Sequence, residues 1–280
     1  MIDAHQHFWR ISRGDYGWMT DAHEPIRRDR LPEDLAPMAA RFGIEGTVVV
    51  QAAPTTAETR FLLDLADLTP LIRGVVGWVD LAAPDAPGQV ARIAREPGLK
   101  GLRPMLQDIE ETEWVLRPEV IAGLRAMARA GLVFDALITP RHLSVIDRLA
   151  ALLPELRIVV DHCAKPVFGP DGDPGAAWRD GMERLAAHER TSCKISGLAN
   201  EFGPGWSAQA LRPVVDHVLA CFGPDRLMWG SDWPVLDLAG DYDGWLSAAR
   251  TLTDHLPEAA QARIFGGTAT AVYGLAADHL

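Results

Sequence analysis

Two histidines near the N-terminus are the first residues in the sequence that could carry chemistry. His5 and His7 are separated by one residue in the stretch MIDAHQHFWR. In an extended strand, residues i and i+2 point to the same side, so the two imidazoles would face one centre from positions about 7 Å apart. Such a pair can bind a metal ion, polarise a substrate carbonyl, or fill space in a core. The rest of the chain has to decide among these three roles.

Further ionisable residues lie in or at the ends of short apolar runs. Asp161 and His162 close RIVVDH, Asp232 closes RLMWGSD, Asp135 lies within LVFDALI, and Arg103 follows LKGL. Charged groups in buried strands cost several kcal/mol unless they are paired or functional. We therefore expect these side chains to converge on one polar site, although Arg103 could instead pair with an acid such as Asp135 inside the protein.

The elements that must position these residues alternate regularly along the chain. Short β-branched runs predict eight strands, at 2–5, 46–51, 73–79, 99–104, 132–138, 157–162, 191–197 and 226–232. Segments of helical periodicity lie between them, for example at 32–43, 118–131 and 207–223. Because parallel strands need crossover helices and eight of them close a sheet, this order predicts a single-domain (β/α)8 TIM barrel over residues 1–280. The competing doubly wound fold would carry a glycine-rich loop after its first strand, where this chain has HQHFWR.

A barrel would bring the candidate residues to one end of the molecule. Active sites of TIM barrels lie at the C-terminal ends of the strands. The long loops expected at 8–30, 163–174 and 198–206 all follow strands and would lie on that same face. This placement disfavours a space-filling role for His5 and His7.

Composition excludes several classes of partner. The chain has 280 residues, of which 48% are hydrophobic and 23% charged, and a net charge of -11 without any basic cluster. Nucleic acid and anionic membrane surfaces would be repelled, so a small-molecule substrate is expected. No apolar run reaches the ~18 residues that span a bilayer, and we expect a cytoplasmic protein. The sequence leaves the oligomeric state open, a homo-oligomer included.

Five motifs together resemble the amidohydrolase superfamily, of the amidohydrolase-2 type. They are DAHQHFW, LKGLR, VVDHCAKP, CKISGL and RLMWGSDWPV, and they occur in the order of the family across almost the whole chain. More narrowly, they resemble its sugar-lactonase branch, which includes L-fuconolactone and L-rhamnonolactone hydrolases and is related to 2-pyrone-4,6-dicarboxylate hydrolase. The resemblance implies a TIM barrel in which Asp232 activates the attacking water.

The sequence departs from the metal-rich members of the superfamily at two positions. Those members place a histidine on the fifth strand, where this chain offers Asp135, and Lys100 matches the bridging residue of strand four only by type. A binuclear centre is therefore not expected. One zinc ion held by His5, His7 and Asp232 fits the ligand preferences of zinc. The alternative is a lactonase that needs no metal, because lactones are more reactive than amides; no organic cofactor is expected.

The resemblance implies a hydrolase that opens a sugar lactone by water attack on its carbonyl. Asp232 would accept a proton from the water, and histidines or a metal ion would stabilise the oxyanion. The catalytic residues expected are Asp232, His162, His5 and His7. The residues expected to hold substrate hydroxyls and ring faces are Arg103, Lys165, Trp9 and Trp233.

Three other functions fit the same residues. One is hydrolysis of a dicarboxylate-type lactone, which would call for several arginines at the barrel mouth. A second is a metal-dependent amidase or decarboxylase of the same superfamily. The third is a barrel that binds a sugar acid without catalysis, in which Asp232→Asn would leave ligand binding intact.

Overall fold

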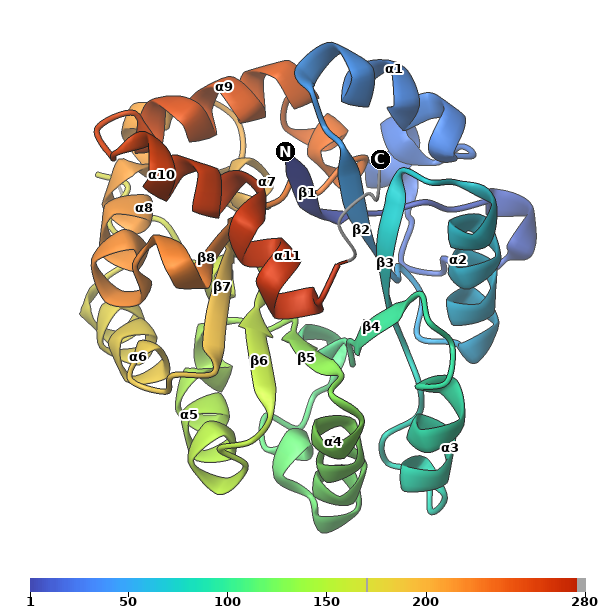
Figure 1. The fold of residues 1–280 in the computed structure, drawn as a ribbon. Helices are drawn as coiled ribbons and strands as arrows, with labels where there is room; N and C mark the ends of the chain where they lie inside the picture. Colours follow the sequence, from blue (N-terminus) through green and yellow to red (C-terminus); the bar gives the residue numbers. More distant parts are fainter. Residues whose placement is uncertain (170, 276–280) are drawn as a thin grey trace.

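Eight parallel strands form a closed ring in the order β1 to β8 (Figure 1). The computed structural model describes residues 1–169 and 171–275. The strands are β1 Ile2–Gln6, β2 Gly46–Val50, β3 Ile72–Gly77, β4 Leu99–Leu102, β5 Val133–Ala136, β6 Arg157–Val160, β7 Thr191–Ile195 and β8 Leu227–Trp229. The ring closes where Gln6 bridges to Trp233 and the His7 amide donates a hydrogen bond to the Trp233 carbonyl (2.7 Å). The predicted TIM barrel is confirmed.

Helices cover the outside of this ring. They are α1 Pro32–Phe42, α2 Thr56–Leu68, α3 Ala86–Ile93, α4 Pro118–Ala130, α5 Leu143–Leu152, α6 Ala176–Ala186, α8 Ala208–Phe222, α9 Tyr242–Thr253 and α10 Glu258–Ala262. The short helix α7 (Leu198–Phe202) follows β7 at the other end of the strands, where the Asn200 side chain donates to the Val235 carbonyl (2.9 Å). In α4, Val120, Leu124 and Met127 recur at helical spacing and are buried, which anchors the helix on the barrel. No helix in the described part of the chain is long and apolar enough to cross a bilayer.

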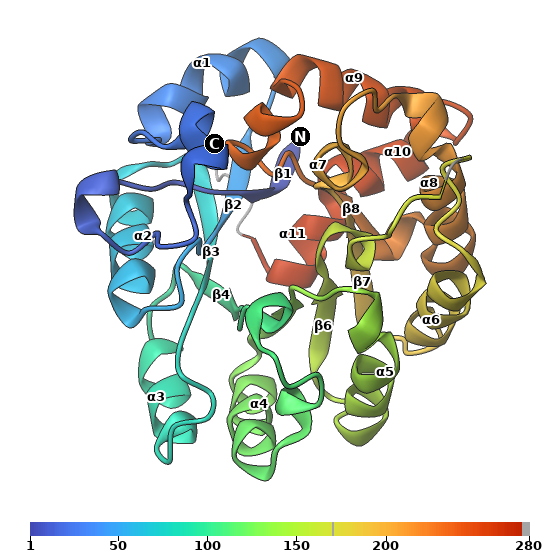
Figure 2. The ribbon, with the colours of Figure 1, turned by 180° about the vertical axis from the view of Figure 1, so that it is seen from behind.

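The last helix, α11 (Thr268–Tyr273), lies across the end of the barrel at which the strands begin (Figure 1). Ala269 and Tyr273 join an apolar cluster with Val48, Val133 and Val159 from inside the barrel. Viewed from behind, the molecule shows the opposite end, where the loops that follow the strands gather (Figure 2). Because α11 covers one end, these loops surround the end that can admit a ligand.

Several strands end earlier than the sequence predicted. β6 stops at Val160 instead of residue 162, and β8 stops at Trp229 instead of residue 232. Beyond β6, residues 162–165 all have φ between 49° and 58°, and Asp232 has φ 59°. The left-handed conformation costs non-glycine residues roughly 1–2 kcal/mol each. Such strain is typical of functional sites, and here it turns His162 and Asp232 away from the strand direction.

Candidate active site

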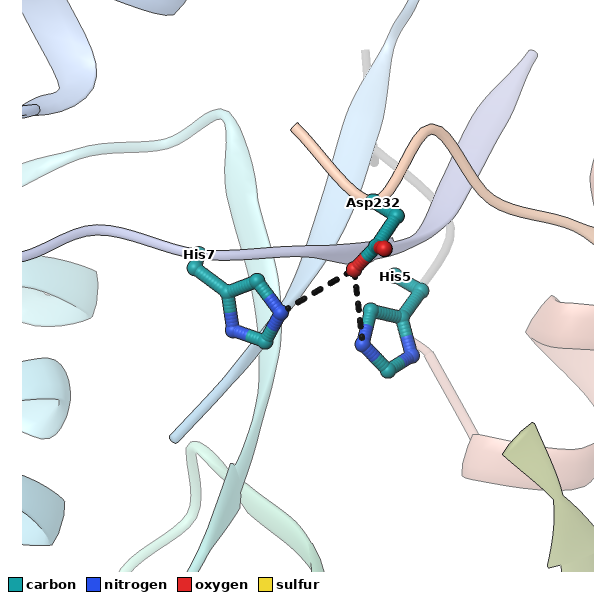
Figure 3. Close-up of side chains that lie close together, drawn as sticks. All are labelled: His5, His7 and Asp232. Carbon is teal, nitrogen blue, oxygen red and sulfur yellow. Dashed lines mark hydrogen bonds and ion pairs between the residues drawn. The ribbon is translucent and has the colours of Figure 1, made fainter. Parts of the chain in front are cut away.

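Three histidines surround one carboxylate oxygen at the mouth of the barrel. His7 Nε2 lies 3.3 Å, His5 Nε2 3.6 Å and His162 Nε2 3.9 Å from Asp232 Oδ1. His5 and His7 project from the end of β1 toward Asp232, which follows β8 (Figure 3). The structure therefore brings together the four residues that the sequence singled out. These residues are far apart along the chain, and the order of the strands in the barrel brings them together.

The backbone around Asp232 is fixed by β1. The Asp232 amide donates to the His5 carbonyl (2.8 Å). Asp3, on the same strand, accepts hydrogen bonds from the Ser231 amide (2.9 Å) and the Tyr242 hydroxyl (2.9 Å). A Cβ on Gly230 would lie only 2.6 Å from His5 Cβ, so this position requires glycine for β8 to approach β1. Asp3 was missed by sequence reasoning, although it precedes His5 by the same two-residue step that links His5 to His7.

The hydrogen bonds of His7 determine its tautomer. Its Nδ1 lies 2.7 Å from the Val50 carbonyl, an acceptor, so Nδ1 must carry a proton and donate it. Nε2 then faces Asp232 Oδ1 at 3.3 Å. An imidazole lone pair and a carboxylate oxygen repel each other at this distance. A cation is therefore required between them, either a proton on Nε2 or a metal ion.

His5 is fully buried and lies one layer deeper than His7. Its Nδ1 is 3.3 Å from Asp161 Oδ1 and 3.2 Å from Lys194 Nζ, while its Nε2 is 3.4 Å from Arg103 Nη1. Burial, reinforced by Lys194, lowers the pKa of His5 well below its ordinary value. His5 is therefore neutral. It contacts Asp232 but does not line the open cavity.

His162 completes the cluster from the turn after β6. Its Nδ1 lies 2.8 Å from the Ser196 hydroxyl, and burial lowers its pKa. The turn after β7 passes close to this ring: Gly197 has φ 65°, and a Cβ there would lie 2.6 Å from His162 Nδ1. Glycine at 197 is thus what allows the imidazole to sit beside Asp232.

Below the histidines, a buried network balances charge inside the barrel. Lys194 Nζ contacts Asp135 Oδ2 (2.6 Å) and Asp161 Oδ1 (3.0 Å), and all three side chains are fully buried. Arg103 Nη1 contacts Asp161 Oδ2 (3.2 Å), and the Tyr273 hydroxyl from α11 donates to Asp135 (2.8 Å). The alternative in which Arg103 pairs with an acid inside the barrel is therefore confirmed, but the acid is Asp161, because Lys194 pairs with Asp135.

The network and the histidines set the ionisation of the acids in opposite directions. Burial would raise the pKa of Asp232, but His162, His7 and His5 outweigh burial and hold that pKa well below its ordinary value. Burial raises the pKa of Asp135 to about 6. For Asp161, Lys194 and His5 overcome burial and lower its pKa well below the usual range. Asp232 is therefore ionised at neutral pH.

At the barrel mouth, two overlapping groups of side chains have donor atoms close enough to share a metal ion; a third group, Glu183, His217 and Cys221, lies elsewhere. The first is His5, His7 and Asp232, and the second is His5, Asp161 and His162. Zinc with ligands at ~2.0–2.1 Å in a tetrahedron places neighbouring ligand atoms roughly 3.3 Å apart, close to the 3.3 and 3.6 Å distances of the first group. In the second group, Lys194 and Arg103 already neutralise Asp161. The donor set thus fits one metal ion, at the first group.

Lys100 does not take part in this site. A Cβ on Gly74 would lie 2.6 Å from Lys100 Cγ and 3.1 Å from the side chain of Leu275, so Lys100 lies at the end of the barrel covered by α11. It cannot bridge two metal ions at the opposite end. This placement agrees with the expectation of at most one ion.

A cavity of about 230 Å³ opens above Asp232. Of the predicted site residues, His7, His162, Asp232, Arg103 and Lys165 line it. His23, which the loop 8–30 could bring to the mouth, lines it as well. Further lining residues were missed by sequence reasoning: Trp18, Ala52, Met105, Gln107, Asp108, Leu137 and Val235. Most of these lie on loops, whose direction no periodicity in the sequence reveals.

The prediction that Trp9 and Trp233 contact substrate is corrected by the structure. Trp9 has no exposed surface, and its indole N–H donates to the Arg28 carbonyl (2.8 Å). Trp233 is 2% exposed and packs against Phe8 beneath the guanidinium of Arg30. Both side chains support the loop 8–30 from behind the cavity. Trp18 instead presents an indole to the cavity from the same loop.

Comparison with known proteins identifies the family. The Amidohydrolase family model matches residues 2–275. An L-fucono-1,5-lactonase of Burkholderia ambifaria is 46% identical over 97% of this chain and 94% of its own length, and one of Burkholderia multivorans is 37% identical over 98% and 96%. A crystal structure of an amidohydrolase from Burkholderia multivorans with bound zinc superposes with a TM-score of 0.92 at 35% identity, over 98% of this chain and 99% of that one. As its motifs predicted, the chain belongs to the amidohydrolase family.

Proposed function

We propose that this protein hydrolyses sugar lactones, with Asp232 as the base that activates water. One observation carries the proposal. All three imidazole contacts fall on Asp232 Oδ1, whereas Oδ2 makes no hydrogen bond or ion pair within the described residues. An ionised carboxylate with one oxygen free, at the floor of a cavity, is placed to accept a proton from water. The similarity to two L-fucono-1,5-lactonases supports a sugar lactone as the substrate class.

The reaction follows from this geometry. Water loses a proton to Asp232 Oδ2 while its oxygen attacks the lactone carbonyl, giving a tetrahedral intermediate. His162 lines the cavity beside Asp232 and is placed to donate a hydrogen bond to the oxyanion. Collapse breaks the bond between the carbonyl carbon and the ring oxygen, which takes the proton from Asp232. The product is a hydroxy acid, which releases one proton to the solution at neutral pH.

His5, His7 and Asp232 are the residues that would hold a metal ion. When bound there, a divalent ion would polarise the carbonyl and help to ionise the water. Without it, the proton on His7 Nε2 would fill the gap between the imidazole and Asp232. In either case Asp232 is held in place by its contacts with His7 and with the His5 carbonyl.

The charges around the cavity favour a neutral substrate over a dicarboxylate. Arg103 and Lys165 line the cavity, but Arg103 is paired with Asp161 and Lys165 with Glu201 (2.8 Å). Two substrate carboxylates would need unpaired cations in bidentate reach. Paired cations still donate hydrogen bonds to hydroxyl groups, so we assign Arg103 and Lys165 to the binding of sugar hydroxyls.

A lactone panel tests the proposed function. Purified protein would be mixed with 1,4- and 1,5-aldonolactones, and with 2-pyrone-4,6-dicarboxylate as the dianionic comparison, while acid release is followed with a pH indicator. We expect rapid acid release from at least one neutral aldonolactone and none from the dicarboxylate. Absence of acid release from every lactone would refute the assignment and favour a barrel that only binds sugar acids.

A further inference from the structure

A second, larger cleft opens beside the catalytic cavity. Its volume is about 590 Å³, against about 230 Å³ for the catalytic cavity. Trp18, Met105 and Asp108 line both, so the two spaces adjoin each other. Cavities that hold drug-sized ligands measure ~300–1,000 Å³, a range that contains the second cleft but not the catalytic cavity. A lactone of one sugar ring would leave the second cleft unfilled.

Three half-buried tryptophans from three different loops form the walls of this cleft. Trp18 follows β1, Trp78 follows β3 and Trp114 lies in the loop after β4. Pro54, Val79, Leu81, Pro104, Met105 and Ile109 provide further apolar surface. Indole faces of this kind pack well against the C–H faces of a sugar ring, because both surfaces are flat and apolar.

The charges in the cleft restrict its occupant. Asp15, Asp80 and Asp108 are the charged groups among the described residues that line it, and no lysine or arginine is among them. Carboxylates accept hydrogen bonds from hydroxyl groups but repel anions. Asp15 is paired with Arg13, which reduces the attraction for a cation. Apolar surface together with hydroxyl acceptors therefore favours a neutral, polyhydroxylated group over an anionic one.

The wall nearest the catalytic cavity is held in place without a ligand. The Trp18 indole N–H donates to the Ala52 carbonyl (2.8 Å), and its ring packs edge to face against Trp9. Two residues earlier, the Tyr16 hydroxyl donates to the buried Glu58 carboxylate (2.7 Å). Little ordering is then required on binding, and such preorganisation favours affinity.

We propose that this cleft is a second sugar subsite, which binds a neutral glycosyl group attached to the lactone that Asp232 hydrolyses. The inference rests on the proposed lactonase function and extends its substrate class to glycosylated aldonolactones. The lactone ring would occupy the cavity above Asp232. The glycosyl group would extend past Trp18 and lie between Trp78 and Trp114.

The test compares the most active monosaccharide lactone of the panel with the same lactone carrying a neutral glucosyl group. Wild-type protein and the Trp114→Ala and Trp78→Ala variants would be assayed on both. We expect each variant to raise KM for the glucosylated lactone roughly threefold to tenfold, as loss of one aromatic contact predicts, and to leave KM for the parent lactone unchanged. Trp206→Ala is the matched control, because Trp206 is half-buried and lines neither cavity.

The outcomes separate this inference from the proposed function. If the parent lactone is hydrolysed but the glucosylated one is refused, or if Trp114→Ala changes KM for both substrates alike, the subsite is refuted and the lactonase stands. A preference for a glucuronyl over a glucosyl derivative would refute the assignment to a neutral group. If no lactone is hydrolysed, the subsite is tested by titrating the protein with cellobiose and following tryptophan fluorescence. Saturable quenching in the wild type that is lost in Trp114→Ala supports the subsite. Absence of quenching refutes it.

Discussion

Lys194 lies where the charges inside the barrel meet. The sequence could place His5, His7, His162 and Asp232 together, because each follows or ends a strand and the strand order sends them to one end. It could not decide which cation pairs with Asp135, since that depends on how far each side chain reaches across the barrel. Lys194 reaches Asp135 and Asp161 together, and this contact leaves Arg103 to line the cavity.

Replacing Lys194 tests the importance of this network for stability. Lys194→Met would leave the buried carboxylate of Asp161 without its ammonium partner, and we expect the free energy of unfolding to fall by about 3–5 kcal/mol. The measurement is chemical denaturation followed by circular dichroism. Arg60→Met is the matched control, because Arg60 pairs with Glu96 at the surface and its loss should change little. Equal effects of the two substitutions would contradict the buried network.

Among the elements, the loop 8–30 contributes most of what the sequence could not reveal. Its position at the barrel mouth was predicted correctly, because it follows the first strand. Which of its tryptophans faces the ligand was not, since Trp9 and Trp18 differ in direction and not in any sequence pattern. Likewise, residues 162–165 contain no glycine, so the sequence does not indicate the left-handed turn that they form. Tertiary packing, which the sequence pattern does not express, decides both.

The loop is tied to α2 through a carboxylate that titrates near neutral pH. Burial raises the pKa of Glu58 from an ordinary value near 4.5 to about 7. Between these values the folded protein holds a proton that the unfolded chain has released, so the free energy of unfolding falls as pH rises through this window, by up to about 3 kcal/mol. Glu58→Gln removes this contribution. Between pH 4.5 and pH 7, the free energy of unfolding of the variant should therefore fall less than that of the wild type.

Thermal unfolding across that pH range measures the difference. Asp3 and Asp135, whose pKa values burial raises to about 6, contribute to the same trend in both proteins and cancel in the comparison. Glu96→Gln provides the control, because Glu96 lies at the surface in its pair with Arg60. If stability depends on pH in the same way in the wild type and in Glu58→Gln, burial does not raise the pKa of Glu58 and this prediction is wrong.

At the scale of the whole molecule, the alternation of eight strands and helices was sufficient to predict the barrel. The segments expected as helices at 118–131 and 207–223 became α4 and α8 almost unchanged, because their apolar residues repeat with helical spacing. The sequence did not predict that α11 covers the end of the barrel at which the strands begin. Tyr273 carries its hydroxyl from this helix to Asp135, so the helix that covers the barrel also supports the network beneath the site.

The same arrangement limits the metal content of the molecule. Lys194 and Arg103 supply the positive charge at Asp161, so the barrel mouth should bind no more than one divalent ion. Cys221→Ser removes a ligand from the separate group of Glu183, His217 and Cys221, so that zinc bound there is not counted. Zinc titration of metal-stripped Cys221→Ser protein, quantified by elemental analysis after gel filtration, should saturate at or below one ion per chain. His7→Ala should weaken this binding, and His188→Ala, a histidine that pairs with Asp147 elsewhere, should not. Two tightly bound ions per chain would contradict the assignment of Lys194.

The central claim is that the Asp232 carboxylate removes a proton from the attacking water. The most direct test is the single-turnover rate of Asp232→Asn on the best lactone of the panel, with lactone binding measured in parallel. Loss of a general base predicts a rate roughly 10²–10⁴-fold lower, with binding to the cavity retained through Arg103 and Lys165. A variant that binds the lactone and opens it at the wild-type rate would contradict the account.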